Sequence, residues 1–522
     1  MPHSPAADGA ARPNILILMA DQLTPGALAA YGNRVSLTPH IDALAESGVV
    51  FDSAYCNSPL CAPSRYALMT GQLPSANGGY DNAAALSSEA VTFAHYLRHA
   101  GYRTILSGKM HFCGADQLHG FEERLTSDIY PADFGWTPDW QRPDARPGWY
   151  HNMSSVIDAG PCVRSNQLDF DDEVVFAARQ KLFDLARERD ADPRPFCLTV
   201  SLTHPHDPYA ISRPYWERYR DEQIDMPRVP AAPPDDDPHS RRLRAVIGLD
   251  QTPVTPRQVR HARRAYYGAI SYVDDQIGAL LDTLAQTGLA ENTVIVLTSD
   301  HGDMLGERGL WYKMNFFEPA SRVPLIVHAP RRFQAHRVAA SVSLVDLLPT
   351  LLDLAHDGRP PAGADFPLDI AGRSLLPHLT RDGGHDEVAA EYLAEGALAP
   401  IVMLRRGAYK FIHSPADPDQ LYHLASDPDE LRNLAREPGS AEVLAGFRAD
   451  ARRRWDLPAL HAQVVASQTR RRFIGAANAL GAHHAWDYEP PRDASRTYIR
   501  NHLDLDTLEA RARFPAPQRS AA

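Results

Sequence analysis

The chain has 522 residues, of which 44% are hydrophobic, so it can bury a large core and is long enough for more than one structural unit. Its formal net charge is −12 at pH 7, with 53 lysine and arginine residues against 65 aspartate and glutamate residues. This acidic balance, with no clustered basic run, argues against a protein that binds nucleic acid.

The N-terminal segment and the cysteines indicate the compartment. The segment has no basic region, and its apolar run at residues 15–20 is too short for a signal peptide or a membrane span. We therefore expect a soluble, cytoplasmic protein without a membrane partner. The cysteines are few, odd in number and unevenly spaced, which predicts reduced thiols. They are Cys56, Cys61, Cys113, Cys162 and Cys197.

Short apolar runs rich in Ile, Val and Leu recur along the chain. They are NILILMADQ, YRTILSGKMH, FCLTVSLTHPH, NTVIVLTSDHG and VPLIVHAP. Runs without polar alternation are typical of strands buried on both faces, and helical stretches lie between them. The predicted fold is therefore α/β, with a mostly parallel sheet covered by helices on both faces.

Helix signals and one irregular stretch complete the N-terminal part, which we predict to be a domain over residues 12–384. Thr38-Pro39 opens a helix that ends at Gly48, and residues 266–288 have apolar side chains at helical spacing. The stretch 115–163 is rich in Trp, Pro and Asp and has little periodicity. Such a long aromatic excursion predicts a lid or a pocket wall.

A second unit is predicted to begin near His385. The stretch IVMLRRGAYKFIHS indicates an antiparallel hairpin that turns at Arg406-Gly407, and LYHLASDPDELRNLA indicates a strand, a turn and a helix. We therefore expect a C-terminal α+β subdomain with an antiparallel sheet over residues 385–486. Residues 487–522 form a polar, arginine-rich tail.

Polar side chains follow four of the apolar runs. They are Asp21 and Gln22, Lys109 and His111, His204 and His206, and Asp300 and His301. A single His or Asp at a strand end is more often a cap or a solvated loop group. Ligands bind outside the carboxyl ends of strands in open parallel sheets, however, so four such ends together predict one shared site.

The residue types at these ends suit a cation and an anion. Carboxylates from Asp21 and Asp300 and the amide oxygen of Gln22 favour Ca²⁺ or Mg²⁺, and the imidazole of His301 extends the choice to Mn²⁺ or Zn²⁺. Positive charge and proton donors would come from Lys109, His111, His204 and Lys313. Such groups suit the tetrahedral oxyanion of a sulfate or phosphate ester.

One further motif is more specific. In CNSPLCAPSRYALMTGQ, Cys61 is followed by Ala62-Pro63-Ser64-Arg65, and Pro63 is placed for the first turn of a helix. This pattern resembles the signature of the type I sulfatases of the alkaline phosphatase superfamily, Cys-x-Pro-Ser-Arg followed by a short apolar spacer and Thr-Gly. The resemblance covers nearly the whole chain and implies an alkaline-phosphatase-like fold.

The resemblance implies the cofactors and the residue roles. A formylglycine-generating enzyme would oxidise Cys61, and the hydrated aldehyde would attack sulfur while a metal and Arg65 hold it as an alkoxide. His204 or Lys313 would protonate the leaving group, and His111 would deprotonate the second hydroxyl. The implied catalytic residues are Cys61, Arg65, Lys109, His111, His204 and Lys313. The implied metal group is Asp21, Cys61, Asp300 and His301, with Ca²⁺ as the first expectation and Mg²⁺ or Mn²⁺ as alternatives.

Two departures from the commoner family pattern narrow the substrate. Many sulfatases have Asp-Asp and Asp-Asn where this chain has Asp21-Gln22 and Asp300-His301. The combination resembles the branch that holds choline sulfatases and phosphonate monoester hydrolases, and it leaves the role of Gln22 open.

Longer stretches resemble choline sulfatases, among them SLTHPHDPY, DHGDMLGERGLWYKMNFFE and YIRNHLDLDTLEARARFP. A quaternary ammonium has no hydrogen to donate and binds through aromatic faces and carboxylates. The resemblance implies such a pocket from Asn82, Trp136, His151, Glu395 and Asp506. Trp136 could instead pack the lid, and Asp506 could be a solvated tail charge.

The expected reaction is hydrolysis of a small sulfate ester, choline O-sulfate. One alternative is a phosphonate monoester or phosphodiester hydrolase with the same residues, and another is a non-catalytic binder that never receives formylglycine. C-terminal tails in this family reach into a neighbouring subunit, so a homo-oligomer, dimer or tetramer, is also expected.

Overall fold

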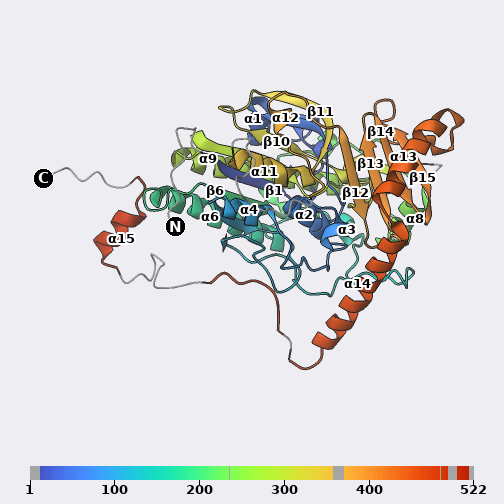
Figure 1. Cartoon of the computed structure of the whole chain (residues 1–522), viewed down its shortest axis with the longest axis horizontal. Helices are drawn as coiled ribbons and strands as arrows, with labels where there is room; N and C mark the ends of the chain where they lie inside the picture. The colour runs from blue at the N-terminus through green and yellow to red at the C-terminus, as the bar shows by residue number, and fades with distance from the viewer. Residues whose placement is uncertain (1–11, 234–235, 357–369, 483, 492–502, 516–522) are drawn as a thin grey trace.

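The computed structural model describes residues 12–233, 236–356, 370–482, 484–491 and 503–515 (Figure 1). Its main sheet has nine strands in the order β11-β2-β10-β8-β1-β6-β3-β4, with β9 paired to β2. The bounds are β1 (Asn14–Ala20), β2 (Val49–Tyr55), β3 (Arg103–Gly108), β4 (Glu123–Arg124), β6 (Phe196–Leu202), β8 (Thr293–Ser299), β9 (Arg322–Val323), β10 (Leu325–His328) and β11 (His336–Ser343).

The centre of this sheet is parallel. β1 pairs in parallel with both β6 and β8, and β6 pairs in parallel with β3. All five apolar runs form strands, which confirms the predicted α/β sheet. β10, from the run VPLIVHAP, is antiparallel to both β8 and β2, because an apolar run does not encode strand direction. β2 and β11, which follow β10 at one end of the strand order, were not predicted.

Helices cover both faces, because the two sides of β1 are both apolar. Leu16 and Leu18 belong to a core shared with α1 (Pro39–Ser47), α6 (Asn166–Arg187) and α9 (Pro256–Gln286). Ile15 and Ile17 belong to a second core shared with α2 (Cys61–Thr70), α4 (Phe93–His99) and α11 (Leu347–Ala355). The helix predicted after Thr38 is confirmed. α9 begins ahead of the predicted residues 266–288, with Thr255 and Gln258 as a capping box.

A second sheet lies near the C-terminus. It is antiparallel, in the order β12 (Glu387–Tyr392), β13 (Ile401–Arg406), β14 (Tyr409–Ser414) and β15 (Asp417–His423). The predicted hairpin is confirmed as β13 and β14, and Gly407 supplies the positive φ of 55° at its turn. The helix expected within LYHLASDPDELRNLA is only the short 3₁₀ turn Leu434–Arg436, and α13 (Ala441–Arg454) follows it. The division at residue 385 stays a prediction.

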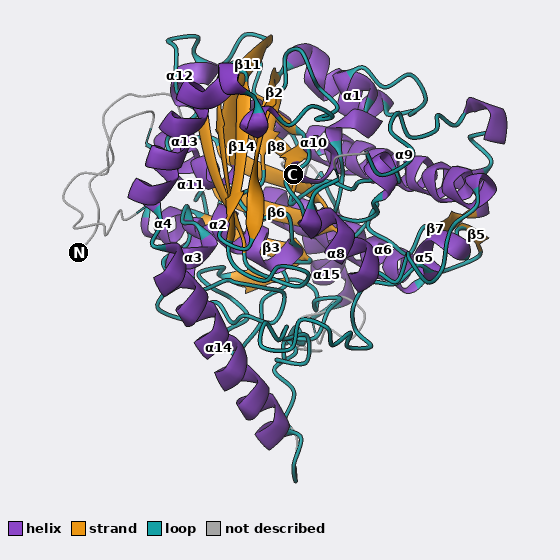
Figure 2. Ribbon diagram, turned by 90° about the vertical axis from the view of Figure 1, so that its right-hand side faces the viewer, coloured by secondary structure: helices purple, strands orange, loops and turns teal. Residues whose placement is uncertain are grey.

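Two segments lie outside these layers. Residues 115–163 are mostly loop, interrupted by β4, α5 (Ser154–Ile157) and β5 (Gly160–Cys162), which pairs with β7 (Ala210–Ser212). α14 (Leu457–Asn478) begins against the body of the molecule and then projects away from it (Figure 2). Of the predicted tail, residues 492–502 and 516–522 lie outside the described part. The described part of the tail contains the helix α15 (Leu505–Ala512). No helix in the described ranges combines the length and apolar character needed to cross a membrane.

Candidate active site

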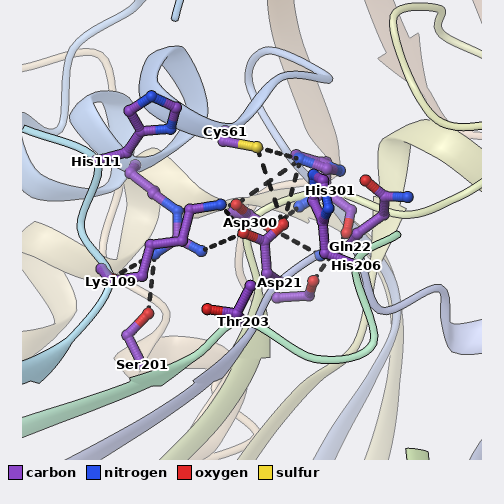
Figure 3. A network of polar contacts seen from close by, with 12 residues as sticks. Asp21, Gln22, Cys61, Lys109, His111, Ser201, Thr203, His206, Asp300 and His301 are labelled. Atoms are coloured by element: carbon purple, nitrogen blue, oxygen red, sulfur yellow. Dashed lines mark hydrogen bonds and ion pairs between the residues drawn. The ribbon is translucent and has the colours of Figure 1, made fainter. Parts of the chain in front are cut away.

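Four strand ends and one helix start converge at one edge of the main sheet (Figure 3). Asp21 follows β1, Lys109 follows β3, and Asp300 follows β8, and all three side chains are fully buried. Cys61 is the first residue of α2 and is also buried. Because parallel neighbours end at the same edge, the register of the sheet alone brings these groups together.

Four of these groups form a compact ligand set. Single ligand atoms of Asp21, Cys61, Asp300 and His301 all lie within 4.8 Å of one another. His301 Nε2 is 3.8 Å from Asp21 Oδ1, 3.7 Å from Asp300 Oδ2 and 3.2 Å from Cys61 Sγ. These are the four residues that the sequence predicted as a metal group.

The chemistry of this set fits a cation. His301 Nδ1 lies 3.0 Å from the Gly302 carbonyl oxygen, which holds the Nδ1 hydrogen and turns the Nε2 lone pair toward the two carboxylates. Burial would lower the pKa of His301, but Asp300 and Cys61 raise it above its usual value. A proton or a divalent cation at Nε2 therefore satisfies the same buried carboxylates.

Gln22 is engaged elsewhere. Its Oε1 accepts a hydrogen bond from Lys313 Nζ at 2.6 Å, and its Nε2 donates to Asp303 Oδ2 at 2.6 Å. Since lysine only donates and a carboxylate accepts, these partners fix which end of the amide is which. In this arrangement the side chain of Gln22 links Lys313 to Asp303.

Two buried cations balance the carboxylates. Arg65 Nε donates to Asp300 Oδ2 at 2.8 Å, and its Nη2 donates to Asp21 Oδ2 at 3.3 Å. Lys109 Nζ pairs with Asp21 and lies 4.2 Å from the centre of the Tyr130 ring. Burial and Cys61 would raise the pKa of Asp21, but Lys109 and other nearby cations lower it to about 2. Both carboxylates of the group are thus held in place by direct ionic contacts.

The surroundings of Cys61 differ from those of the other cysteines. Burial would raise the pKa of its thiol, but Lys109, Lys313 and His301 lower it well below the usual value. Burial raises the pKa of Cys113 to about 12 and also raises that of Cys56 and Cys197. The site therefore stabilises negative charge at position 61. All five cysteines are free thiols, as predicted.

Of the two histidines that follow β6, His206 is the one that contacts Lys313, and the catalytic role predicted for His204 stays a prediction. His206 Nε2 lies 2.7 Å from Lys313 Nζ. His204 instead places Nδ1 2.7 Å from Asp171 Oδ2 on α6 and packs against Tyr272 of α9. The two histidines follow β6 in a turn, so residues two apart point to different sides, unlike in a strand.

His111 lies in an aromatic surround at the edge of the group. Its ring is 5.1 Å from Tyr130 and 5.8 Å from Trp136, measured between ring centres. Both ring nitrogens are buried, and neither has a hydrogen-bond partner among the described residues. A buried imidazole without a partner has capacity for a proton or a substrate group.

Four of the five residues predicted for the ammonium pocket lie near Cys61, His111 or Lys313. Asn82 Oδ1 accepts a hydrogen bond from the Ala62 N–H at 2.9 Å, in the first turn of α2. Trp136 packs beside His111, and His151 Nε2 lies 3.2 Å from Lys313 Nζ.

Glu395 is the most unusual of the four. Its side chain is buried, and Oε2 has no hydrogen-bond partner among the described residues. Burial is the main cause that raises the pKa of Glu395 to about 7, and the charges of Asp81, Lys313 and Cys61 also act on it. Asp506, by contrast, is exposed on α15, which lies far from α2 in Figure 1.

Tyr130 and Asp207 were not identified from the sequence, and His206 was placed at the shared site without a specific role. The Tyr130 ring contacts His111, Trp136 and Lys109. His151, His206 and Asp207 form a second group of close ligand atoms. The aromatic richness of residues 115–163 signalled a pocket wall, but no local pattern identifies which ring enters the site.

Comparison with known families agrees with this geometry. The family model "Sulfatase" matches residues 13–357, and the model "Choline sulfatase enzyme C terminal" matches residues 462–514. A third model, "N-sulphoglucosamine sulphohydrolase, C-terminal", matches residues 306–454. The chain belongs to the sulfatase family.

Individual relatives refine the comparison. A choline-sulfatase of Rhizobium meliloti (strain 1021) is 48% identical over 515 residues, covering 97% of this chain and 99% of the relative. An arylsulfatase of Clostridium perfringens (strain 13 / Type A) is 30% identical, covering 67% of this chain and 76% of the relative. The solved phosphonate monoester hydrolase SpPMH from Silicibacter pomeroyi has a TM-score of 0.66 at 24% identity, covering 85% of this chain and 95% of its own, so the similarity concerns the fold.

Proposed function

We propose that this chain hydrolyses choline O-sulfate to choline and sulfate. One observation carries the proposal: the site has a cationic end at Lys109 and Lys313 together with a buried carboxylate, Glu395, whose Oε2 has no hydrogen-bond partner among the described residues. Choline O-sulfate carries a negative sulfate and a positive ammonium, so both ends find an opposite charge. The 48% identity to a choline-sulfatase over nearly the full chain supports the same substrate.

Two groups that sulfatases use are assigned to residues of this chain. We assign Cys61 as the residue converted to formylglycine, whose hydrated aldehyde supplies two hydroxyl groups on one carbon. We assign Asp21, Cys61, Asp300 and His301 as the metal group, with Ca²⁺ first and Mg²⁺ or Mn²⁺ as alternatives. A divalent cation there supplies positive charge for an oxyanion at position 61 and for the sulfate oxygens.

The chain's own residues orient the ester and move protons. Lys109 and Lys313 bind the sulfate oxygens, and Arg65 holds the two carboxylates in position through its contacts at 2.8 and 3.3 Å. Lys313 and His206, 2.7 Å apart, hold the proton that the departing choline oxygen takes. His111, whose ring nitrogens are unpartnered among the described residues, takes a proton from residue 61.

The ammonium end is bound without hydrogen bonds. The faces of Trp136 and Tyr130 and the carboxylate of Glu395 attract the quaternary nitrogen. The incoming cation favours the ionised form of Glu395, whose pKa of about 7 leaves it partly protonated at neutral pH in the free protein. Asn82 and His151 line the space between the sulfate end and the ammonium end of the site.

Two partners belong to the proposal. A formylglycine-generating enzyme modifies Cys61, and a second copy of this chain supplies Asp506, since that residue is exposed on α15 in its own chain. The free thiols fit the predicted cytoplasmic compartment.

The test combines two measurements on protein made in its native host. The tryptic peptide that contains Cys61 is expected to have an aldehyde mass, and the same sample is expected to release choline from choline sulfate. An unmodified thiol in active protein would contradict the assigned nucleophile. An aldehyde without choline release would instead favour the second candidate, a phosphonate monoester hydrolase, whose fold this chain shares.

A further inference from the structure

The buried face of α14 is built around one arginine. Arg471 Nη1 donates to Asp81 Oδ1 at 2.7 Å, and Nη2 donates to Asp81 Oδ2 at 2.6 Å. The two side chains are 6% and 0% exposed. Nη1 also donates to Thr137 Oγ1 at 3.1 Å, and Nε donates to Ser467 Oγ at 3.2 Å. A bidentate pair with further donors in use fixes both partners closely.

Arg471 forms hydrogen bonds with Asp81 and Thr137, which are the sequence neighbours of two residues of the proposed ammonium pocket. Asp81 directly precedes Asn82, and Thr137 directly follows Trp136. Asp81 Oδ1 also accepts from the Ala83 N–H at 3.0 Å, so the turn that carries Asn82 is fixed on both sides. The guanidinium is therefore a shared anchor for two segments that are far apart in the sequence.

One helical turn earlier, Gln468 reaches a third segment. Its Oε1 accepts from the Trp140 N–H at 2.9 Å. The Trp140 indole Nε1 donates to the Ala394 carbonyl oxygen at 3.0 Å, and Ala394 precedes Glu395. Because residues 468 and 471 lie on one face of the helix, α14 contacts the segments of Asp81 and Trp136 directly and the segment of Glu395 through Trp140.

The charges on this face suit a cation pocket. Arg471 would repel a quaternary ammonium if it were alone, but the carboxylate of Asp81 cancels its charge at contact distance. Neither Arg471 nor Asp81 is an extra ligand for the substrate, since the two side chains form an ion pair with each other. Their contribution is the placement of Asn82 and Trp136.

We propose that Arg471 is a positioning residue that sets specificity for the ammonium end of the substrate. It acts through Asp81 and Thr137 on Asn82 and Trp136, and its own hydrogen bonds go to Asp81, Thr137 and Ser467 and not to the residues of the sulfate end. This inference rests on the proposed function, because it concerns the pocket for the choline group.

The test compares two substrates in Arg471→Lys and Arg471→Gln. Choline sulfate has an ammonium, whereas p-nitrophenyl sulfate does not. Because displacing substrate-positioning groups by about 1 Å costs on the order of 10²-fold, we expect kcat/KM for choline sulfate to fall by that factor, mainly through KM. The kcat for p-nitrophenyl sulfate is expected to stay at the wild-type value. The Ki of free choline as a competitive inhibitor is expected to rise with the KM for choline sulfate.

Two further variants serve as controls. Arg470→Gln changes an exposed arginine on the same helix and is expected to match the wild type on both substrates. Asp81→Asn removes the same bond from the other side, so the double variant Arg471→Gln/Asp81→Asn is expected to be little worse than either single one. Circular dichroism at the assay temperature checks that each variant is folded.

Equal loss on both substrates in folded variants would overturn the inference and leave Arg471 a merely structural residue. An unchanged Ki for choline in Arg471→Lys would overturn it as well. Failure of the proposed function is distinguishable, because it appears in the wild type as turnover of p-nitrophenyl sulfate without turnover of choline sulfate.

Discussion

The two ends of the site are constructed differently. The sulfate end comes from strand ends and the first turn of α2, and its Asp21, Arg65 and Asp300 side chains are fully buried and bonded to one another. The ammonium end comes from loops, with Trp136 in the irregular stretch 115–163, and is held by α14. Under the proposed function, the chemistry thus depends on the sheet, whereas substrate choice depends on loops that contact α14.

The largest effect is expected at the sulfate end, at the nucleophile. Cys61→Ala should reduce kcat for every sulfate ester on the order of 10⁶-fold, the cost typical of removing a nucleophile. The matched control is Cys162→Ser, at a half-buried thiol on β5, which should keep wild-type activity. Turnover of p-nitrophenyl sulfate measures both variants, and comparable loss in the two would contradict the assignment.

The next effect separates His206 from His204, which was a catalytic histidine predicted from the sequence. His206→Ala should lower kcat by about 10²- to 10⁴-fold on choline sulfate, whose alkoxide leaves poorly, and much less on p-nitrophenyl sulfate, whose leaving group needs no proton. His204→Ala should weaken the contact with Asp171 and lower the melting temperature, with no dependence on the leaving group. A leaving-group dependence in the His204 variant alone would favour His204 instead of His206 as the proton donor.

A smaller effect is expected at the ammonium end, and it depends on pH. The carboxylate of Glu395 attracts the cation only when it is ionised, and its pKa is raised to about 7. The Ki of choline should therefore rise as the pH falls below 7, up to the value measured for a neutral side chain at position 395, and level off above pH 7.

The variant Glu395→Gln isolates this dependence. It should weaken choline binding by about 10-fold or more, since an ionic contact in a desolvated site is lost. It should also remove the pH dependence of Ki in the range from pH 5 to 7. A slope that persists in the variant would assign the titration to another group.

The smallest effect is expected from the helix that supports the pocket. Gln468→Ala removes one hydrogen bond to the Trp140 N–H and, at about 1 kcal/mol, should raise the KM for choline sulfate about fivefold. Gln463→Ala, at an exposed position of α14, is the control and should leave KM unchanged. A larger effect from the control would mean that the helix acts through its stability alone.

Much of the sulfate end could be predicted from the sequence. Apolar runs gave the five strands, and the residues directly after them include Asp21, Lys109 and Asp300, because strand ends meet at one sheet edge. His204 was predicted from the sequence, whereas His206 is the histidine that contacts Lys313, because the path of a turn decides which of the two faces that lysine. The direction of β10 could not be predicted either, because a buried strand has the same apolar sequence pattern in a parallel or an antiparallel orientation.

The ammonium end was far less predictable. The ion pair between Arg471 and Asp81 connects residues 390 positions apart in the chain, and neither residue is part of a local sequence motif. Tyr130 enters the site from a stretch without periodicity, so only the tertiary structure identifies it. α9 was predicted too short because its polar first turns lack the apolar spacing of residues 266–288.

The most direct test of the two-ended site is the ratio of kcat/KM for choline sulfate to kcat/KM for a phosphonate monoester, measured on one preparation of modified enzyme. The account predicts a ratio far above one, since only choline sulfate offers an ammonium to Glu395 together with a sulfate to Lys109 and Lys313. A ratio at or below one would contradict it and would make the shared phosphonate hydrolase fold the better guide to function.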